Sequence, residues 1–196
     1  MEARKNLKNC RRIVVKVGSS TITHDSGLIN ISRLEKLARE LADLHNEGRE
    51  VLLVTSGAVA AGVGRLGHRD YPKTLPLKQA LAAIGQGTLL HLYEKFFAEY
   101  GKDIAQVLLT KDDFDERLRY LNARNTLTTL LQLGAIPVIN ENDTVAVEEI
   151  RFGDNDTLSA LVAEIVAADL LVILTDIAGL FNDDPHVNPR AEQYWE

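Results

Sequence analysis

The 196-residue sequence has very little cysteine and no long hydrophobic run. Its one cysteine, Cys10, excludes an internal disulfide and is typical of a protein in a reducing compartment. No unbroken apolar stretch approaches the ~20 residues that a membrane-spanning helix needs. The amino-terminal residues are basic and polar and lack the apolar centre of an export signal. The sequence therefore predicts a cytoplasmic protein that has no membrane partner.

Basic residues are in the minority, since 22 lysines and arginines stand against 28 aspartates and glutamates. A net charge of −6 makes nucleic acid an unfavourable partner, because binding to nucleic acid depends on neutralising its phosphates. The five histidines are scattered, and no His-Glu-x-x-His or paired-cysteine spacing indicates zinc. The composition, 45% apolar and 26% charged, is that of a globular protein, and the length suits one domain with a sizeable core.

Short β-branched apolar runs alternate along the chain with segments of helical periodicity. The runs predict strands at 11–17, 50–55, 104–110, 135–140 and 169–175, and a surface strand or hairpin at 145–152. Helices are predicted at 31–46, from 56 onwards, and at 77–99, 113–133 and 157–168. This alternation favours an α/β fold, a three-layer αβα sandwich around a mostly parallel open sheet. No linker or repeat divides the sequence, so we expect a single domain over residues 1–196.

Several residues are placed to begin or end the predicted helices. Ser32 and Glu35 have the spacing of a capping box, and Gly48 stands where a C-terminal glycine belongs. Ser56 follows a strand, where it would either cap the next helix or bind an anion together with the helix N-terminus. GVGRLG (62–67) matches the dinucleotide fingerprint in letters only, because it follows a helical segment; it predicts a glycine-rich helix exit.

Polar residues gather where the predicted strands end, in KVGSS, VTSGA, INENDT and LTDIAG. Ligands of open α/β sheets bind at the carboxyl ends of the strands, so these four segments predict one site. Lys16 supplies a positive charge on a long side chain, and Gly18 lets backbone N–H groups approach a phosphate closely. Neither belongs to a Walker A loop, since no G-x-x-x-x-G-K-[ST] is present.

Amides and carboxylates occur together in INENDT and FGDND. Such a set suits a zwitterion, because a carboxylate accepts from an ammonium group and an amide can serve both charged groups. The same oxygens would also suit Mg²⁺ or Ca²⁺, although the EF-hand pattern is absent. Thr175 and Asp176 would either hold part of a nucleotide or form a capped turn. From these residues two functions remain open: a nicotinamide-dependent oxidoreductase and a non-catalytic amino-acid-binding module.

In order and spacing, VVKVGSS, VTSGAVAAG, PVINENDTV, FGDNDTLSALVA and LTDIAGLF resemble the amino acid kinase family from about residue 11 to the end. The resemblance implies the carbamate kinase-like version of the αβα sandwich. KVGSS, NEND and GDND are most similar to the branch that acts on L-glutamate. It implies ATP-dependent phosphorylation of the glutamate side-chain carboxylate with Mg²⁺, giving glutamyl 5-phosphate in the first step of proline biosynthesis.

The resemblance also implies roles for individual residues. Lys16 would contact the transferring phosphate, and Asp156 would orient catalytic lysines. L-glutamate would be held by Ser56, Asp143 and Asn155. The nucleotide would be held by Lys16, Gly18, Ser19, Ser20, Thr175 and Asp176. No side chain is assigned as a metal ligand, and Asp154 is expected only to cap a helix.

Further expectations follow from the family. Its members suggest a homo-oligomer, feedback inhibition by L-proline and a partnership with glutamyl phosphate reductase. Their kinase domain continues with a glycine-rich nucleotide loop and a second catalytic lysine, which this sequence lacks. We therefore expect a C-terminally truncated domain without that segment and without the PUA-like accessory domain of some members. A truncated sheet would expose an edge and apolar surface, and the activity of such a chain is open.

Overall fold

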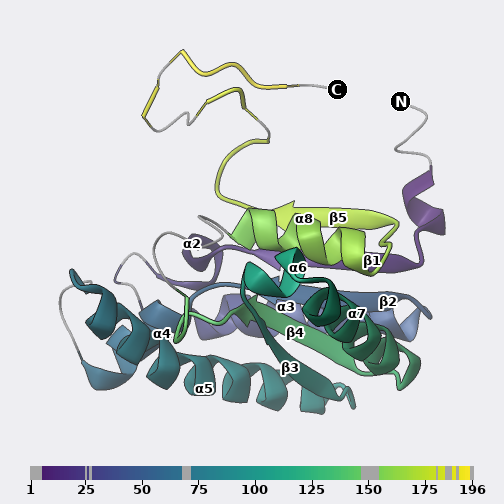
Figure 1. The fold of residues 1–196 in the computed structure, drawn as a ribbon, viewed down its shortest axis with the longest axis horizontal. Helices are drawn as coiled ribbons and strands as arrows, with labels where there is room; N and C mark the ends of the chain where they lie inside the picture. Colours follow the sequence, from purple (N-terminus) through teal and green to yellow (C-terminus); the bar gives the residue numbers. More distant parts are fainter. Residues whose placement is uncertain are drawn as a thin grey trace.

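The structure, a computed structural model, describes residues 6–24, 26, 28–67, 72–146, 155–179, 181–183, 187–188 and 190–194. Within them one parallel sheet has the strand order β3-β4-β2-β1-β5 (Figure 1). Its strands are β1 (Arg12–Val17), β2 (Glu50–Thr55), β3 (Ile104–Leu109), β4 (Ile136–Glu141) and β5 (Leu170–Leu174). Each lies within one residue of its predicted bounds. A short β-branched run that is apolar throughout is typical of a parallel strand buried on both faces.

Helices cover both faces of the sheet, which confirms the three-layer α/β prediction (Figure 1). One layer holds α3 (Ile31–Asn46), α4 (Ala58–Leu66) and α5 (Leu75–Glu99). The other holds α7 (Arg117–Gln132) and α8 (Asn155–Ile165). Three short helical segments complete the described elements: η1 (Asn6–Asn9), α2 (Ser19–Ile22) and α6 (Asp112–Asp115).

Alternate residues of each central strand feed the two cores, since successive strand side chains point to opposite faces. In β1, Val15 and Val17 pack with α3 and α5, whereas Val14 packs with α7 and α8. In β2, Leu53 faces the first core and Leu52 the second. Both faces of these strands are therefore apolar, and polar residues are left to the strand ends.

The start of α3 differs from the predicted capping box. The helix begins at Ile31, and Asn30 is the cap, its side chain accepting a hydrogen bond from the backbone N–H of Arg33 at 3.0 Å. Ser32 consequently lies inside the helix, and Glu35 accepts from the hydroxyl of Tyr100 at 2.7 Å. The capping-box prediction is wrong because asparagine two residues earlier makes the equivalent bond. Gly48, with φ +84°, follows the helix end as predicted.

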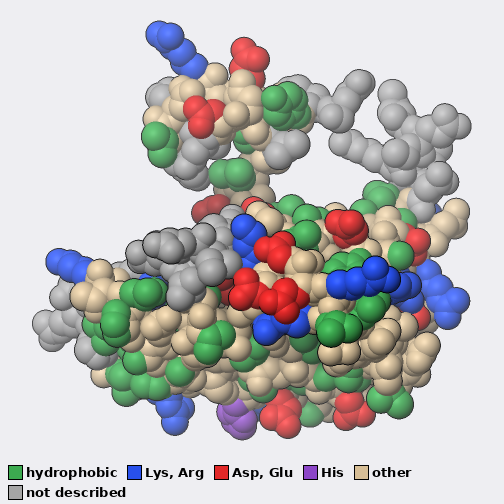
Figure 2. All heavy atoms as spheres, viewed as in Figure 1, with side chains coloured by type: hydrophobic (Ala, Val, Ile, Leu, Met, Phe, Trp, Pro, Cys, Tyr) green, Lys and Arg blue, Asp and Glu red, His purple; other side chains and the backbone are tan. Residues whose placement is uncertain are grey.

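The helix predicted at 113–133 is two helices. Glu116 is extended (φ −92°, ψ 120°) and separates α6 from α7. Asp113 stabilises this corner: its carboxylate accepts from the backbone N–H and the hydroxyl of Thr110 and pairs with Arg119 at 2.7 Å. Helical periodicity continues across the corner, so the sequence pattern alone does not reveal it. Figure 2 shows acidic and basic side chains side by side on this face of the molecule.

The strand or hairpin predicted at 145–152 lies mostly outside the described residues, as does Asp154. Residues 145 and 146, which the structure describes, are in a turn and its exit rather than in a strand. The helix predicted at 157–168 begins at Asn155 and ends at Ile165.

GVGRLG lies at the end of α4, as predicted, and its glycines serve helix packing. A Cβ at Gly62 would lie 2.0 Å from the carbonyl oxygen of Leu81 in α5. Gly67 ends the helix in the left-handed conformation (φ +66°). A dinucleotide fingerprint needs these glycines directly after a strand, at the opening of a helix. The oxidoreductase alternative therefore loses the feature on which it rested.

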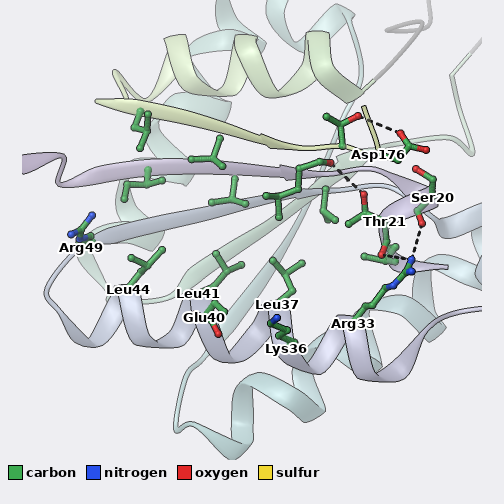
Figure 3. A pocket seen from close by; sticks show the side chains of 18 of the residues that line it. Ser20, Thr21, Arg33, Lys36, Leu37, Glu40, Leu41, Leu44, Arg49 and Asp176 are labelled. Atoms are coloured by element: carbon green, nitrogen blue, oxygen red, sulfur yellow. Dashed lines mark hydrogen bonds between the residues drawn. The ribbon is translucent and has the colours of Figure 1, made fainter. Parts of the chain in front are cut away.

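A cavity of about 690 Å³ lies between α3 and the β1–β5 side of the sheet (Figure 3). Apolar residues of α3, β1 and β5 line it: Leu37, Leu41, Leu44, Ile13, Val15, Val17, Leu170, Val172 and Leu174. Among the described strands β5 is an outer one, and its Ile173 is 42% exposed. The edge and apolar surface expected from the sequence are thus present in the described structure.

Asp169 ties β5 to the start of β1, and this contact predicts an acid-sensitive contribution to stability. Its carboxylate accepts from the backbone N–H groups of Arg11 and Arg12 at 2.8 Å each, which lowers its pKa below the ordinary 3.8. A lowered folded-state pKa stabilises the fold above pH 3.8, and this stabilisation is lost as the pH falls through the folded-state value.

Asp169→Ala is therefore expected to lower the free energy of unfolding at pH 7, with the difference shrinking as the pH falls below 3.8. Urea denaturation at a series of pH values measures this. Glu164→Ala, another exposed carboxylate in the same region, is the control. A pH-independent difference for Asp169→Ala would contradict the electrostatic explanation.

Candidate functional site

The parallel register brings the polar strand ends to one edge of the sheet. Val17 is level with Thr55 on one side and with Leu174 on the other, and Val54 is level with Ile139. The residues that follow these positions therefore form a row, from β4 through β2 and β1 to β5. This is the edge at which open α/β sheets bind ligands.

Lys16 and Asp156 form an ion pair at the centre of this row. Their Nζ and Oδ1 atoms are 2.5 Å apart, and the lysine side chain is 7% exposed. A buried ammonium group requires a partner of opposite charge, which the first turn of α8 supplies. Gly18 is adjacent: a Cβ there would lie 3.6 Å from Lys16 Nζ. The absence of a side chain at Gly18 keeps the space beside the ammonium group open.

Asn155 joins α8 to the end of β2. Its Nδ2 lies 2.8 Å from the backbone oxygen of Thr55, 2.7 Å from Ser56 Oγ and 3.0 Å from Asn140 Oδ1. Two of the predicted substrate residues, Ser56 and Asn155, are therefore in direct contact. Since Asn155 is followed by Asp156, one helix turn contacts both β1 and β2.

Ser56 does not cap α4, so this reading of the residue is wrong. Gly57 is the capping position and has φ +98°, a conformation that side chains other than glycine rarely adopt. The preceding Thr55 is fully buried, and its hydroxyl is 2.8 Å from that of Tyr93. Burial raises the pKa of Tyr93, so the phenol stays neutral, and its hydrogen bond to Thr55 stabilises the end of β2.

Asn140 and Gln86 extend the amide cluster beyond the predicted residues. Asn140 is 2% exposed, and its Nδ2 donates to Gln86 Oε1 at 2.9 Å. Asn140 could have been predicted as a site residue from the sequence, because it is a polar residue directly after an apolar run. Gln86 could not have been predicted, since a glutamine inside a helix is ordinary. Only the packing of α5 on β4 brings it to Asn140.

Asp143 lies on the turn after β4, and its side chain lines a small cleft. The same cleft is lined by Gln86, by Thr144 and by Ala58, the first residue of α4. The structure therefore places Asp143 on the β4 side of the Ser56–Asn155 contact, and its role as a substrate-binding carboxylate stays a prediction.

The predicted nucleotide residues lie at the β1–β5 end of the row. Ser19 and Ser20 begin α2, which Thr21 ties to β5 through a hydrogen bond from its hydroxyl to Leu174 O at 3.4 Å. Thr175 and Asp176 follow β5 and are exposed. Ser20, Thr175 and Asp176 all line the cavity, and Figure 3 shows Ser20 and Asp176 at one end of it. The six predicted nucleotide residues thus lie around two neighbouring strand ends.

The described residues contain no group of three or more His, Cys, Asp or Glu side chains arranged to hold a metal ion. Among the described helices none combines the length and the apolar character that crossing a membrane requires.

Comparisons of the sequence with known proteins identify its family. Residues 11–195 match the model of the amino acid kinase family. The glutamate 5-kinase of Moorella thermoacetica is 62% identical over 190 residues, which are 97% of this chain and 50% of that protein. That of Caldanaerobacter subterraneus subsp. tengcongensis is 65% identical over 181 residues, 92% of this chain and 49% of that protein.

The glutamate 5-kinase of Clostridium acetobutylicum is 54% identical over 187 residues, 95% of this chain and 70% of that protein. The chain thus spans about half the length of the first two relatives. The match runs through every strand end of the site. From its sequence and its parallel αβα architecture, the chain belongs to the amino acid kinase family.

Proposed function

We propose that this chain carries the glutamate site and the phosphoryl-transfer centre of a glutamate 5-kinase. The observation that carries the proposal is the Lys16–Asp156 pair one strand away from the Ser56–Asn155 contact. A buried positive charge then stands beside a cluster of amides suited to an amino acid. The identity of 54–65% to three glutamate 5-kinases supports the choice of substrate.

The order of the strands suggests the order of the reactants along the edge. The amino acid would lie over β4 and β2, the transferring phosphoryl group over β1 and the nucleotide beside β5. An oxygen of the glutamate side-chain carboxylate forms a bond to the γ-phosphorus of ATP as the bond from that phosphorus to the β–γ bridging oxygen breaks. The products are glutamyl 5-phosphate and ADP.

In this reaction the protein supplies position and charge. Two anionic reactants approach each other, so a lysine ammonium group lowers their repulsion and stabilises the equatorial phosphoryl oxygens. Asp156 holds Lys16 Nζ in place, Asn155 and Ser56 bind the amino acid, and Asp143 accepts a hydrogen bond from its ammonium group. Holding the carboxylate in line with the phosphorus supplies a further part of the rate.

ATP and Mg²⁺ are proposed as the co-substrate and its ion. Proteins commonly hold Mg²⁺ through one or two carboxylates together with substrate phosphates and water. The oxygen set near the nucleotide end, with the exposed Asp176 carboxylate and the Thr175 hydroxyl, fits that mode. Bound Mg²⁺ would neutralise phosphate charge. The Lys16–Asp156 pair performs its positioning role independently of where the ion binds.

The wider predictions rest on the same kinship, except the location, which rests on the composition of the sequence. They comprise proline biosynthesis as the pathway, a homo-oligomer, feedback inhibition by L-proline, glutamyl phosphate reductase as a partner, and the cytoplasm as the location. The single amino acid kinase domain over residues 1–196 stays a prediction as well.

Calorimetric titration of the 196-residue chain with L-glutamate tests the proposed site, with D-glutamate and L-aspartate as controls. We expect selective binding of L-glutamate, because Asn155, Ser56 and Asp143 present polar groups at set positions. ADP release in the presence of ATP, Mg²⁺ and L-glutamate then tests transfer. A folded chain that binds none of the three amino acids would contradict the assignment, and glutamate binding without any transfer would favour the non-catalytic binding module.

A further inference from the structure

We propose that Gln86 is a specificity-determining residue whose Nε2 donates a hydrogen bond to the α-carboxylate of the amino acid substrate. The inference rests on the proposed function and assigns a residue for which the sequence patterns have no role. It follows from the direction in which the linked side-chain amides of Asn155, Asn140 and Gln86 must point.

The orientation of Asn155 is set by a backbone carbonyl. Its amide contacts the oxygen of Thr55 at 2.8 Å, and a carbonyl oxygen only accepts hydrogen bonds. The NH₂ group must therefore face Thr55 and the neighbouring Ser56. The Oδ1 atom, on the other side of the same amide, is left as an acceptor directed away from Thr55.

The orientation of Asn140 is set by a backbone N–H. The N–H of Glu141 donates to Asn140 Oδ1 at 2.9 Å, and an N–H group only donates. The same Oδ1 also accepts from Asn155 at 3.0 Å. The NH₂ group of Asn140 must therefore face Gln86, where it donates to Oε1 at 2.9 Å.

These two constraints determine the direction of Gln86. Its Oε1 is used by Asn140, so its Nε2 and both of that atom's hydrogens face the other way. Among the residues that the structure describes, Nε2 has no hydrogen-bond partner. The side chain lines the small cleft that it shares with Asp143, Glu141 and Ala58. The cleft therefore has a neutral donor on one wall and carboxylates on another.

An amino acid's α-carbon groups match these walls. The carboxylates of Asp143 and Glu141 favour the ammonium group and disfavour a second carboxylate. The cleft itself has a volume of about 10 Å³, room for a single water, so the substrate carboxylate would lie at its opening. A carboxylate there needs a donor, and Gln86 Nε2 offers one.

The strand order indicates which end of glutamate lies here. Gln86 contacts β4, and Lys16 is on β1, two strands away. Adjacent strands are about 4.8 Å apart, so the two sites are separated by about 10 Å along the edge. The reacting side-chain carboxylate must be at Lys16, where the positive charge is. The α-carbon end therefore lies toward Gln86.

Calorimetric titration tests the inference with L-glutamate and its α-amide, L-isoglutamine. Gln86→Met keeps the side-chain length and removes the donor, so we expect L-glutamate affinity to fall by about 10-fold or more. The affinity for L-isoglutamine, which has no α-carboxylate, should change by less than about threefold. Thr88→Ala, two residues further along α5, is the control. It removes a hydrogen bond from the Thr88 hydroxyl to the backbone oxygen of Ile84 in the same helix, and it should leave both affinities unchanged.

Gln86→Glu separates direct contact from positioning. Glutamate at this position keeps an acceptor for Asn140 but presents negative charge to the substrate carboxylate. We expect it to bind L-glutamate more weakly than Gln86→Met does, with a melting temperature near that of the wild type. Recovery of wild-type affinity in Gln86→Glu would overturn the inference, because Gln86 would then act only through Asn140.

The wild-type chain distinguishes the inference from the proposed function. A folded wild type that binds neither ligand overturns both. A wild type that binds L-glutamate, together with Gln86 variants of unchanged affinity, overturns only the role of Gln86. An equal loss of affinity for both ligands in Gln86→Met also overturns it.

Discussion

Asp156→Ala is expected to lower the rate of glutamyl phosphate formation by about 100-fold or more while changing L-glutamate affinity by less than about threefold. Asp156 is paired with Lys16 at 2.5 Å and makes its contact at β1 rather than at the amide cluster. Its loss therefore acts on the charge that stabilises the transferring phosphoryl group. The groups that hold the amino acid, at Asn155 and Ser56, stay in place.

Lys16 is the side chain through which this effect would operate. Its side chain is 7% exposed. Without Asp156, α8 would no longer supply a negative charge to balance this nearly buried ammonium group. The group would then shift toward solvent, away from the position where the phosphoryl charge develops. Lys16→Met should cause a similar loss of rate, and the double variant should lose little more, because the two residues act as one unit.

ADP release under saturating L-glutamate, ATP and Mg²⁺ measures the rate, and calorimetry measures the affinity. Glu164→Ala, an exposed carboxylate later in the same helix, is the matched control and should match the wild type in both. Equal losses of rate and of glutamate affinity in Asp156→Ala would argue against an orienting role. Full additivity of Asp156→Ala and Lys16→Met would argue that the two side chains act separately.

The second large effect is expected at Gly85, where α5 crosses α4. A Cβ at Gly85 would lie 1.7 Å from the carbonyl oxygen of Ala58 and 2.4 Å from the backbone nitrogen of Gly62. These are backbone atoms of a helix, so they cannot move aside as a flexible side chain can. We expect Gly85→Ala to lower the free energy of unfolding by about 3 kcal/mol or more, at the upper end of the range for overpacking.

Gly87→Ala is the control for this prediction, since nothing lies within 4 Å of its Cβ position. In the interior of the same helix, replacing this glycine should stabilise the protein by about 0.5–1 kcal/mol. Urea denaturation of both variants measures the two effects, which have opposite signs. A stability near that of the wild type for Gly85→Ala would show that the helices do not pack as closely as the structure has them.

Gly85 also connects packing to the site. The next residue, Gln86, contacts Asn140. Gly85 itself packs against α4, which begins directly after Ser56 and Gly57. A separation of α4 from α5 would therefore move both walls of the cleft that holds Asp143. Any Gly85→Ala protein that remains folded should bind L-glutamate more weakly than Gly87→Ala does.

The strands were predictable and several helix boundaries were not, for a physical reason. A strand such as β2 is apolar on both faces because two cores require it, so its pattern has one meaning. A helix boundary depends on one or two hydrogen bonds among polar residues. Asn30 made such a bond in place of Ser32, and Asp113 stabilised a corner inside a continuous helical pattern.

The candidate site divides in the same way. Lys16 and Ser56 could be named from the sequence because polar residues at the ends of apolar strands are conspicuous, and parallel strands bring such ends to one edge. Asn155 and Asp156 were conspicuous as polar residues directly before an apolar helix, and the family resemblance implied their roles. The contacts of Asp156 with Lys16 and of Asn155 with Ser56 then depended on where α8 docks. No pattern along the chain specifies that docking.

The sequence by itself determined the α/β class, the five strands, the edge at which the candidate site lies and the family. These follow from local properties: which runs are apolar, and which residues stand at their ends. Only the tertiary structure decided that Gln86 of α5 meets Asn140 and that Gly62 and Gly85 pack two helices together. Such contacts join residues far apart in the chain, and their energies depend on distances and directions that exist only after the layers have packed.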